Sequence, residues 1–137
     1  MSKILALSEA VGIALHSMAL IAMHDKPHNV TSLTEETGAS KHHIAKVMQR
    51  LVKAGLLKST RGPAGGFLLM RKPKEITLLE IYEAIEGKVL IHDCPMDCEK
   101  CPLDNICMLG EVGEKVAKEF IKYMKETTLQ NIKDDHT

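Results

Sequence analysis

Residues 38–71 read GASKHHIAKVMQRLVKAGLLKSTRGPAGGFLLMR, a capped helical segment followed by a glycine-rich hairpin. Ser40 is a favourable N-cap and Gly55 a favourable C-cap, so we expect a helix over residues 41–54. The apolar residues of this helix recur at three- and four-residue steps, which predicts one buried face: Ile44, Val47, Met48, Leu51 and Val52.

A shorter helix should precede this segment, from the N-cap Asn29 to about Thr37, with Gly38 at the tight turn between the two. Two helices in this order, the second with a basic polar face, are typical of a helix-turn-helix. A polar helical face is by itself more often only solvated. If it meets DNA, the candidates for base or phosphate contact are Ser40, Lys41, His42, His43, Lys46, Gln49 and Arg50.

The hairpin decides between these interpretations. Residues 56–61 and 67–71 read as two strands, and residues 62–66 form a glycine-rich tip between them. A phosphate-cradling enzyme loop would instead open a helix and carry a Lys-Ser/Thr pair. A two-stranded wing after a recognition helix predicts a winged helix, and the wing adds five candidate DNA contacts: Arg61, Gly62, Pro63, Gly65 and Gly66.

The flanking segments complete a mainly α fold. A largely buried helix is expected over residues 4–24, and residues 72–74 read as a linker. Thr77 and Glu80 form a capping box that opens a helix ending at Gly87.

The last helix is expected from about residue 104 to 128, and it carries two apolar rows. One row is Ile106, Gly110, Gly113, Ala117, Phe120 and Met124; the other is Leu109, Val112, Val116 and Tyr123. So wide an apolar surface favours contact with the same helix of a second subunit over packing within one chain only.

The expected fold class is therefore mainly α with a small β-wing. We expect the chain to divide into a winged helix-turn-helix domain (1–87), a cysteine-containing loop (88–107), a dimerisation helix (104–130) and a disordered tail (131–137).

Charge separates the two halves of the chain. Residues 1–75 hold eleven Lys and Arg against five Asp and Glu, a net +6, and residues 76–137 hold seven against thirteen, a net −6. A basic half indicates a polyanionic partner, although two solvated surfaces would give the same split. With no Trp, two Phe and two Tyr, base stacking on single-stranded nucleic acid is disfavoured.

All four cysteines lie within fourteen residues, Cys94, Cys98, Cys101 and Cys107, in the spacing C-x3-C-x2-C-x5-C. Thiolates this close suit a soft metal, and the unequal spacing favours an iron–sulfur cluster over zinc. Disulfides or four unrelated thiols are the alternatives. The N-terminus shows no secretory signal and no apolar run is long enough for a membrane span, so we expect a cytoplasmic protein, where structural disulfides are rare.

With these elements in order, the chain resembles the Rrf-two family of bacterial transcription regulators over about residues 5–128. The motifs that carry the resemblance are ALHSM at 14–18, LVKAGLL at 51–57 and RGPAGGF at 61–67. The resemblance implies a homodimer that reads double-stranded DNA with a dyad-symmetric operator.

Members that bind a cluster use three cysteines, the last two separated by five residues. Cys101 and Cys107 match that pair, and Cys94 or Cys98 would be the first. The position that supplies His in the iron–sulfur branch is Gly110 here, and Glu9 lies about one turn before the position of the Asp ligand in the nitric oxide branch. The simplest expectation is that all four cysteines hold one cluster per subunit, with 4Fe–4S slightly favoured over 2Fe–2S.

The leading hypothesis is thus a dimeric, iron–sulfur-dependent DNA-binding regulator that senses redox state, nitric oxide, oxygen or cluster status. A zinc- or thiol-based DNA-binding regulator without a cluster is the second hypothesis, and a cluster carrier or electron-transfer protein is the third. No Cys–His or Ser–His–acid constellation stands outside the cysteine loop, so we expect no enzyme activity.

Overall fold

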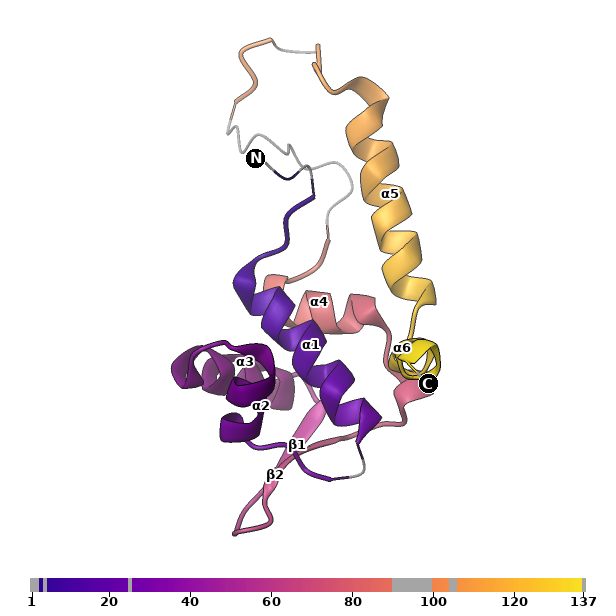
Figure 1. Ribbon diagram of the computed structural model, residues 1–137. Helices are drawn as coiled ribbons and strands as arrows, with labels where there is room; N and C mark the ends of the chain where they lie inside the picture. The colour runs from indigo at the N-terminus through magenta and orange to yellow at the C-terminus, as the bar shows by residue number, and fades with distance from the viewer. Residues whose placement is uncertain (1–2, 4, 25, 90–99, 104–105, 137) are drawn as a thin grey trace.

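The computed structural model describes residues 3, 5–24, 26–89, 100–103 and 106–136. Helix α1 (Glu9–Met23) lies at the centre of the molecule, with α2 (Val30–Thr37) and α3 (Lys41–Lys53) on one side of it (Figure 1). The expectation that α1 starts at residue 4 is wrong. Ser8 has an extended backbone (φ −64°, ψ 156°), and its Oγ accepts a hydrogen bond from the Val11 N–H at 3.2 Å, which makes Ser8 the N-cap.

The helix-turn-helix is confirmed by its caps. Asn29 Oδ1 accepts from the Ser32 N–H at 2.8 Å, and Ser32 Oγ accepts from the Asn29 N–H at 3.0 Å, so the two residues form a reciprocal capping box for α2. Gly38 ends α2 in the left-handed region at φ 76°. Ser40 Oγ then accepts from the His43 N–H at 3.2 Å, which opens α3 where the sequence predicts it.

The wing consists of β1 (Leu57–Thr60) and β2 (Gly66–Leu69), which are slightly shorter than expected. They pair antiparallel, with Leu57 opposite Leu69 and Thr60 opposite Gly66. The hairpin extends from the body of the molecule beyond the ends of α1 and α2 (Figure 1).

One core holds these elements together. Helix α1 packs against α3, α4 (Leu78–Glu86) and α6 (Leu129–His136), and this is why apolar residues surround most of it. The core consists mainly of aliphatic side chains that are almost inaccessible to solvent: Val11, Ala14, Met18, Leu33, Ile44, Met48, Leu51, Leu57, Ile76, Ile81 and Leu129.

After the wing, a short 3-10 turn η1 (Pro73–Glu75) replaces the expected linker and leads to α4. The capping box of α4 is confirmed, because Thr77 Oγ1 accepts from the Glu80 N–H at 3.2 Å and a Glu80 carboxylate oxygen accepts from the Thr77 N–H at 3.1 Å. Arg71 adds an ion pair to Glu80 at 3.0 Å.

Helix α5 (Gly110–Glu126) begins later than the predicted residue 104. Turns precede it, in which the Ile106 N–H donates to the Leu103 carbonyl at 3.1 Å and the Gly110 N–H donates to the Cys107 carbonyl at 3.0 Å. Gly110 has φ 54°, a left-handed conformation that a helix cannot continue through, so the helical run starts there.

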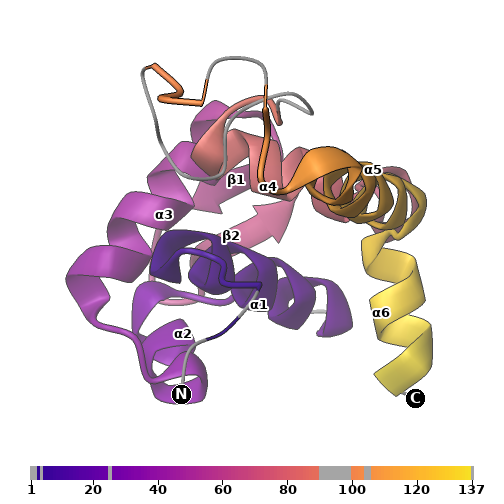
Figure 2. The same ribbon diagram turned by 90° about the horizontal axis from the view of Figure 1, so that it is seen from above.

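The prediction of a disordered tail over residues 131–137 is wrong for residues 131–136, which belong to α6. Asn131 Oδ1 accepts from the Thr128 N–H at 2.8 Å at the start of this helix, and Leu129 is 1% exposed. Burial of Leu129 against the body stabilises a segment whose polar composition alone suggests disorder. Figure 2 shows α6 leaving the end of α5 at the edge of the molecule.

Main-chain hydrogen bonds join the α5–α6 junction to the start of α4. The Leu78 N–H donates to the Thr127 carbonyl at 2.9 Å, the Leu129 N–H donates to the Ile76 carbonyl at 3.0 Å, and Thr77 bridges Thr128. The lower end of α5 is therefore fixed to the body, while its upper end leads to the cysteine loop (Figure 1). None of the helices in the described part of the chain is long and apolar enough to cross a membrane.

Candidate nucleic-acid interface

The recognition helix α3 presents a polar face to solvent. Its apolar side is buried against the body, and every candidate contact predicted on it is exposed: Ser40, Lys41, His42, His43, Lys46, Gln49 and Arg50. Ser40 caps the start of the helix, and the C-cap Ala54 is followed by Gly55 in the left-handed region (φ 81°), so the charged side chains project from a helix with both ends fixed. The arrangement is suited to a polyanion that is wide enough to meet a whole helix face.

The wing presents a second exposed surface beside this helix. Arg61, Gly62 and Pro63 are exposed at its tip, and Gly65 and Gly66 are half-buried. The Gly65 N–H donates to the Gly62 carbonyl at 2.9 Å, and a side chain at Gly65 would collide with the Thr60 carbonyl oxygen. Glycine is thus needed for the turn that leaves Arg61 free to reach a phosphate or a narrow groove.

A hollow of about 430 Å³ separates the wing from the start of α2. Asn29, Thr31 and Ser59 line it together with the glycines of the wing. Sequence reasoning did not include these three polar residues among the candidate contacts. In the sequence, the N-cap Asn29 with Thr31 at the start of a helix was the available sign of a polar site. Only the fold shows that the wing lies opposite these residues.

His43 is not independent of the rest of the molecule. Its Nδ1 lies 3.2 Å from Glu9 Oε1 at the start of α1, and both side chains remain more than half exposed (52% and 67%). Glu9 therefore sits beside the recognition helix of its own chain. The carboxylate places a negative charge next to the basic face of α3.

The four-cysteine prediction is only partly covered by the structure. Cys101 and Cys107 are exposed and in no disulfide, whereas Cys94 and Cys98 lie outside the described residues. Within the described residues no group of three or more His, Cys, Asp and Glu side chains is placed to hold a metal. The two exposed thiols fit the soft-ligand chemistry that iron–sulfur clusters and zinc require, and the ligand set stays a prediction.

The two apolar rows of α5 have different surroundings. Phe120 meets Tyr82 of α4 edge to face, with ring centroids 5.5 Å apart, and Met124 is 4% exposed. That part of the first row packs within its own chain, and the expected contact with a second subunit stays a prediction for the rest of the helix surface. The second row remains open to solvent, with exposed fractions from 39% to 63%: Leu109, Val112, Val116 and Tyr123.

The sequence model of the protein family described as "Rrf2: Iron-dependent Transcriptional regulator" matches residues 7–135 of this chain. A protein of Aquifex aeolicus (strain VF5), named as an HTH-type transcriptional regulator, is 30% identical over 135 residues, which is 94% of each chain.

Solved structures give the same result. The structure titled "T. potens IscR" has a TM-score of 0.78 and 27% identity, and the match covers 97% of this chain and 89% of that one. CymR, described as the global cysteine regulator of B. subtilis, has a TM-score of 0.76 and 24% identity over 96% and 98% of the two chains. At that identity the likeness to CymR establishes the fold.

Proposed function

The chain belongs to the Rrf2 family of winged-helix transcriptional regulators, and from this premise we propose that it is a dimeric, iron–sulfur-dependent regulator of transcription. Membership makes it a DNA-binding protein and not an enzyme. The observation that carries the DNA-binding proposal to individual residues is the rigid basic face of α3 beside the exposed Arg61 of the wing. We place its action in the cytoplasm.

On DNA, α3 would enter the major groove, and its exposed side chains would read base edges or neutralise phosphates. The wing would contact the backbone or the neighbouring minor groove through Arg61. Two copies related by a twofold axis would meet two half-sites, so the operator would be dyad-symmetric.

An operator titration across ionic strength tests this placement. Arg61→Ala should weaken binding and make the salt dependence shallower. With one contact to DNA lost, fewer counterions are released on binding. The matched control is Lys125→Ala, which removes one exposed cation from the last turn of α5, away from the proposed interface. Equal losses in the two variants would remove the wing from the interface.

We place the dimer contact on α5, through its exposed row of Leu109, Val112, Val116 and Tyr123. Each segment of the chain then has a proposed role. Residues 1–87 bind DNA, residues 88–107 hold the cluster, and the helix within 104–130 joins the subunits. The cluster loop lies next in sequence to the dimer helix, so cluster binding would change how the two winged domains are spaced.

Cys94, Cys98, Cys101 and Cys107 would hold the cluster, 4Fe–4S ahead of 2Fe–2S. Bound there, the cluster supplies a redox- and ligand-sensitive centre. The four thiolates would have to come close together for the cluster to form, so cluster binding and folding of the chain around it would be coupled. Exposed Cys101 and Cys107 leave such a centre open to nitric oxide, oxygen or an electron donor.

Anaerobic purification followed by absorption spectra and analysis of iron and sulfide decides the cofactor. Equal amounts of iron and sulfide are expected, and Cys101→Ser and Cys107→Ser should each abolish them. Cys94→Ser and Cys98→Ser show whether four cysteines are required: loss in both supports four-thiolate ligation, and one silent variant excludes it.

A zinc- or thiol-based DNA-binding regulator is the second candidate, and the free, exposed thiols of Cys101 and Cys107 favour it. A colourless protein with stoichiometric zinc, or a metal-free protein whose operator affinity depends on thiol oxidation, would establish it in place of the cluster. A cluster carrier without regulated DNA binding is the third candidate, and operator binding that responds to cluster loss excludes it.

A further inference from the structure

The outer part of the wing is attached to the connection between α1 and α2. The Phe67 N–H of β2 donates to the His28 carbonyl oxygen at 2.8 Å, and the two residues form an isolated antiparallel bridge. Gly66 makes this close approach possible, since a Cβ there would lie 2.6 Å from the same oxygen. The main chain of His28 therefore fixes where β2 lies.

This attachment differs from the one at the base of the hairpin. At the base, the Met70 N–H donates to the Leu56 carbonyl at 3.0 Å, and the Leu56 N–H donates to the Leu51 carbonyl of α3 at 3.0 Å. A two-stranded hairpin has little stability of its own in water. Among the described residues, the hydrogen bond from Phe67 to the His28 carbonyl is the main-chain contact that holds the tip-side half of the wing to the body.

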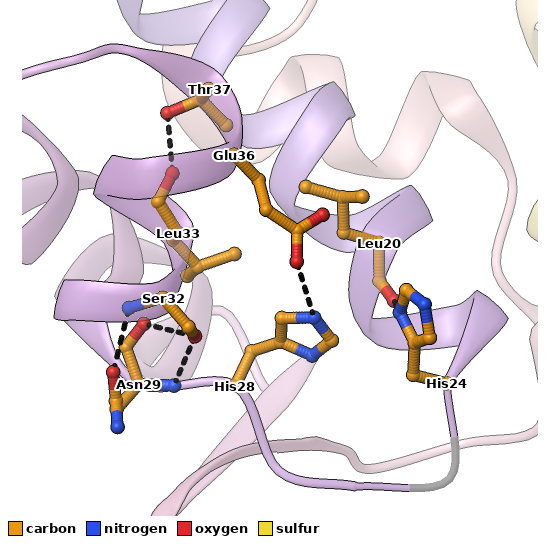
Figure 3. A network of polar contacts seen from close by, with 8 residues as sticks. All are labelled: Leu20, His24, His28, Asn29, Ser32, Leu33, Glu36 and Thr37. Carbon is orange, nitrogen blue, oxygen red and sulfur yellow. Dashed lines mark hydrogen bonds and ion pairs between the residues drawn. The ribbon is translucent and has the colours of Figure 1, made fainter.

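The imidazole of His28 is enclosed between two helices. The residue is 6% exposed, its Nε2 lies 3.5 Å from Glu36 Oε1 of α2, and its ring centroid lies 5.0 Å from that of His24 (Figure 3). Nδ1 of His28 has no hydrogen-bond partner among the described residues. Among the described residues, Glu36 is thus the polar side chain that lies next to the ring nitrogens of His28.

His24 is itself held in place. Its Nδ1 lies 3.0 Å from the Leu20 carbonyl oxygen in the last turn of α1 (Figure 3). The ring of His28 therefore rests against a fixed neighbour on one side and pairs with Glu36 on the other. Rotation of the ring out of this site would move the residue whose carbonyl holds the wing.

We propose that His28 is a positioning residue for the wing, and that Glu36 acts on DNA binding through it. Glu36 holds the imidazole, the imidazole fixes the His28 main chain, and the His28 carbonyl fixes β2 and so the place of Arg61. The inference rests on the proposed contact between the wing and DNA. It adds a residue on α2, outside the DNA-binding face, that sets operator affinity.

Glu36→Ala tests the proposal, with Glu35→Ala as the matched control. Both residues are exposed acids of α2, so each variant removes one negative charge and gains the same helix propensity. Amide hydrogen exchange at Phe67 is the direct measurement. It should be faster in Glu36→Ala than in Glu35→Ala, and unchanged exchange at Phe67 would overturn the inference whatever the DNA affinity does.

Operator affinity supplies the functional measurement. Glu36→Ala should bind the operator about two- to fivefold more weakly than Glu35→Ala, which is the loss expected for one partly exposed polar contact. In an Arg61→Ala background this difference should shrink, because the wing has then lost its charged contact with DNA. A difference of the same size in that background would mean that Glu36 does not act through the wing, and would overturn the inference.

The two proposals fail in different ways. If Arg61→Ala alone leaves operator affinity unchanged, the contact between wing and DNA is wrong, and exchange at Phe67 still decides whether His28 holds the wing. If Arg61→Ala weakens binding but Glu36→Ala matches its control in both measurements, the wing contact stands and the role of His28 falls. Circular dichroism of both glutamate variants verifies that α2 remains folded.

Discussion

Replacing Val116 with Ser should weaken dimerisation without unfolding the chain. Val116 is 54% exposed on α5 of a single chain, in the row that we assign to the partner. Full burial of a Val side chain stabilises by about 1.5–3 kcal/mol, and roughly half of that gain remains for a partner to supply. The loss is therefore about 1 kcal/mol for each subunit.

A twofold axis counts the substitution twice, so the dimer should lose about 2 kcal/mol. That change raises the dimer dissociation constant roughly thirtyfold. Sedimentation equilibrium over a range of protein concentrations measures it. Because the side chain is already exposed, the helix content in far-ultraviolet circular dichroism should stay at the level of the unmodified protein.

Lys115→Ser is the matched control, since Lys115 is exposed at the adjacent position of the same helix. It should change the dissociation constant little. A dimer of unaltered strength in Val116→Ser, or an equal weakening in both variants, would show that this row of α5 is not the seam and would refute the assignment of the dimer helix.

Three further substitutions have expected outcomes. Leu129→Ala should lower the free energy of unfolding by about 2–5 kcal/mol in urea titration, since Leu129 is 1% exposed and docks α6; a loss below 1 kcal/mol would count against that docking. Ser40→Ala should cost about 1 kcal/mol of stability, because the cap on the His43 N–H is lost, whereas Ser40→Asp should retain most of it. Lys46→Ala should lower the slope of log affinity against log salt by about 1 with similar effects on all DNA sequences, and a sequence-dependent effect would reassign Lys46 to base reading.

Local signals explain what the sequence predicted well. The caps at Ser40 and Gly55 and the apolar stripe between them act within a few residues, so α3 follows from the sequence almost to the residue. The wing was predictable for the same reason, because the turn at its tip needs glycine at Gly65. The exposed DNA candidates then follow from the orientation of α3.

Contacts between distant segments explain what the sequence missed. Helix α6 looks disordered by composition and is held by Leu129, whose N–H bonds to the Ile76 carbonyl. Splitting the two rows of α5 required the position of Tyr82 on α4. The role of His28 depends on Phe67, which lies in another element, and no local pattern marks that pair.

The junction between α5 and α6 is held to the body, so any tilt of α5 would pivot about this end. Seventeen residues of α5 extend about 25 Å from that junction toward the cysteine loop. A tilt of only about 5° at the junction displaces the far end by about 2 Å, which is the scale of helix shifts in allosteric proteins. A change too small to disturb the core would therefore be enough to alter the proposed seam between two subunits. The displacement is largest at the end of α5 that lies next to Cys107.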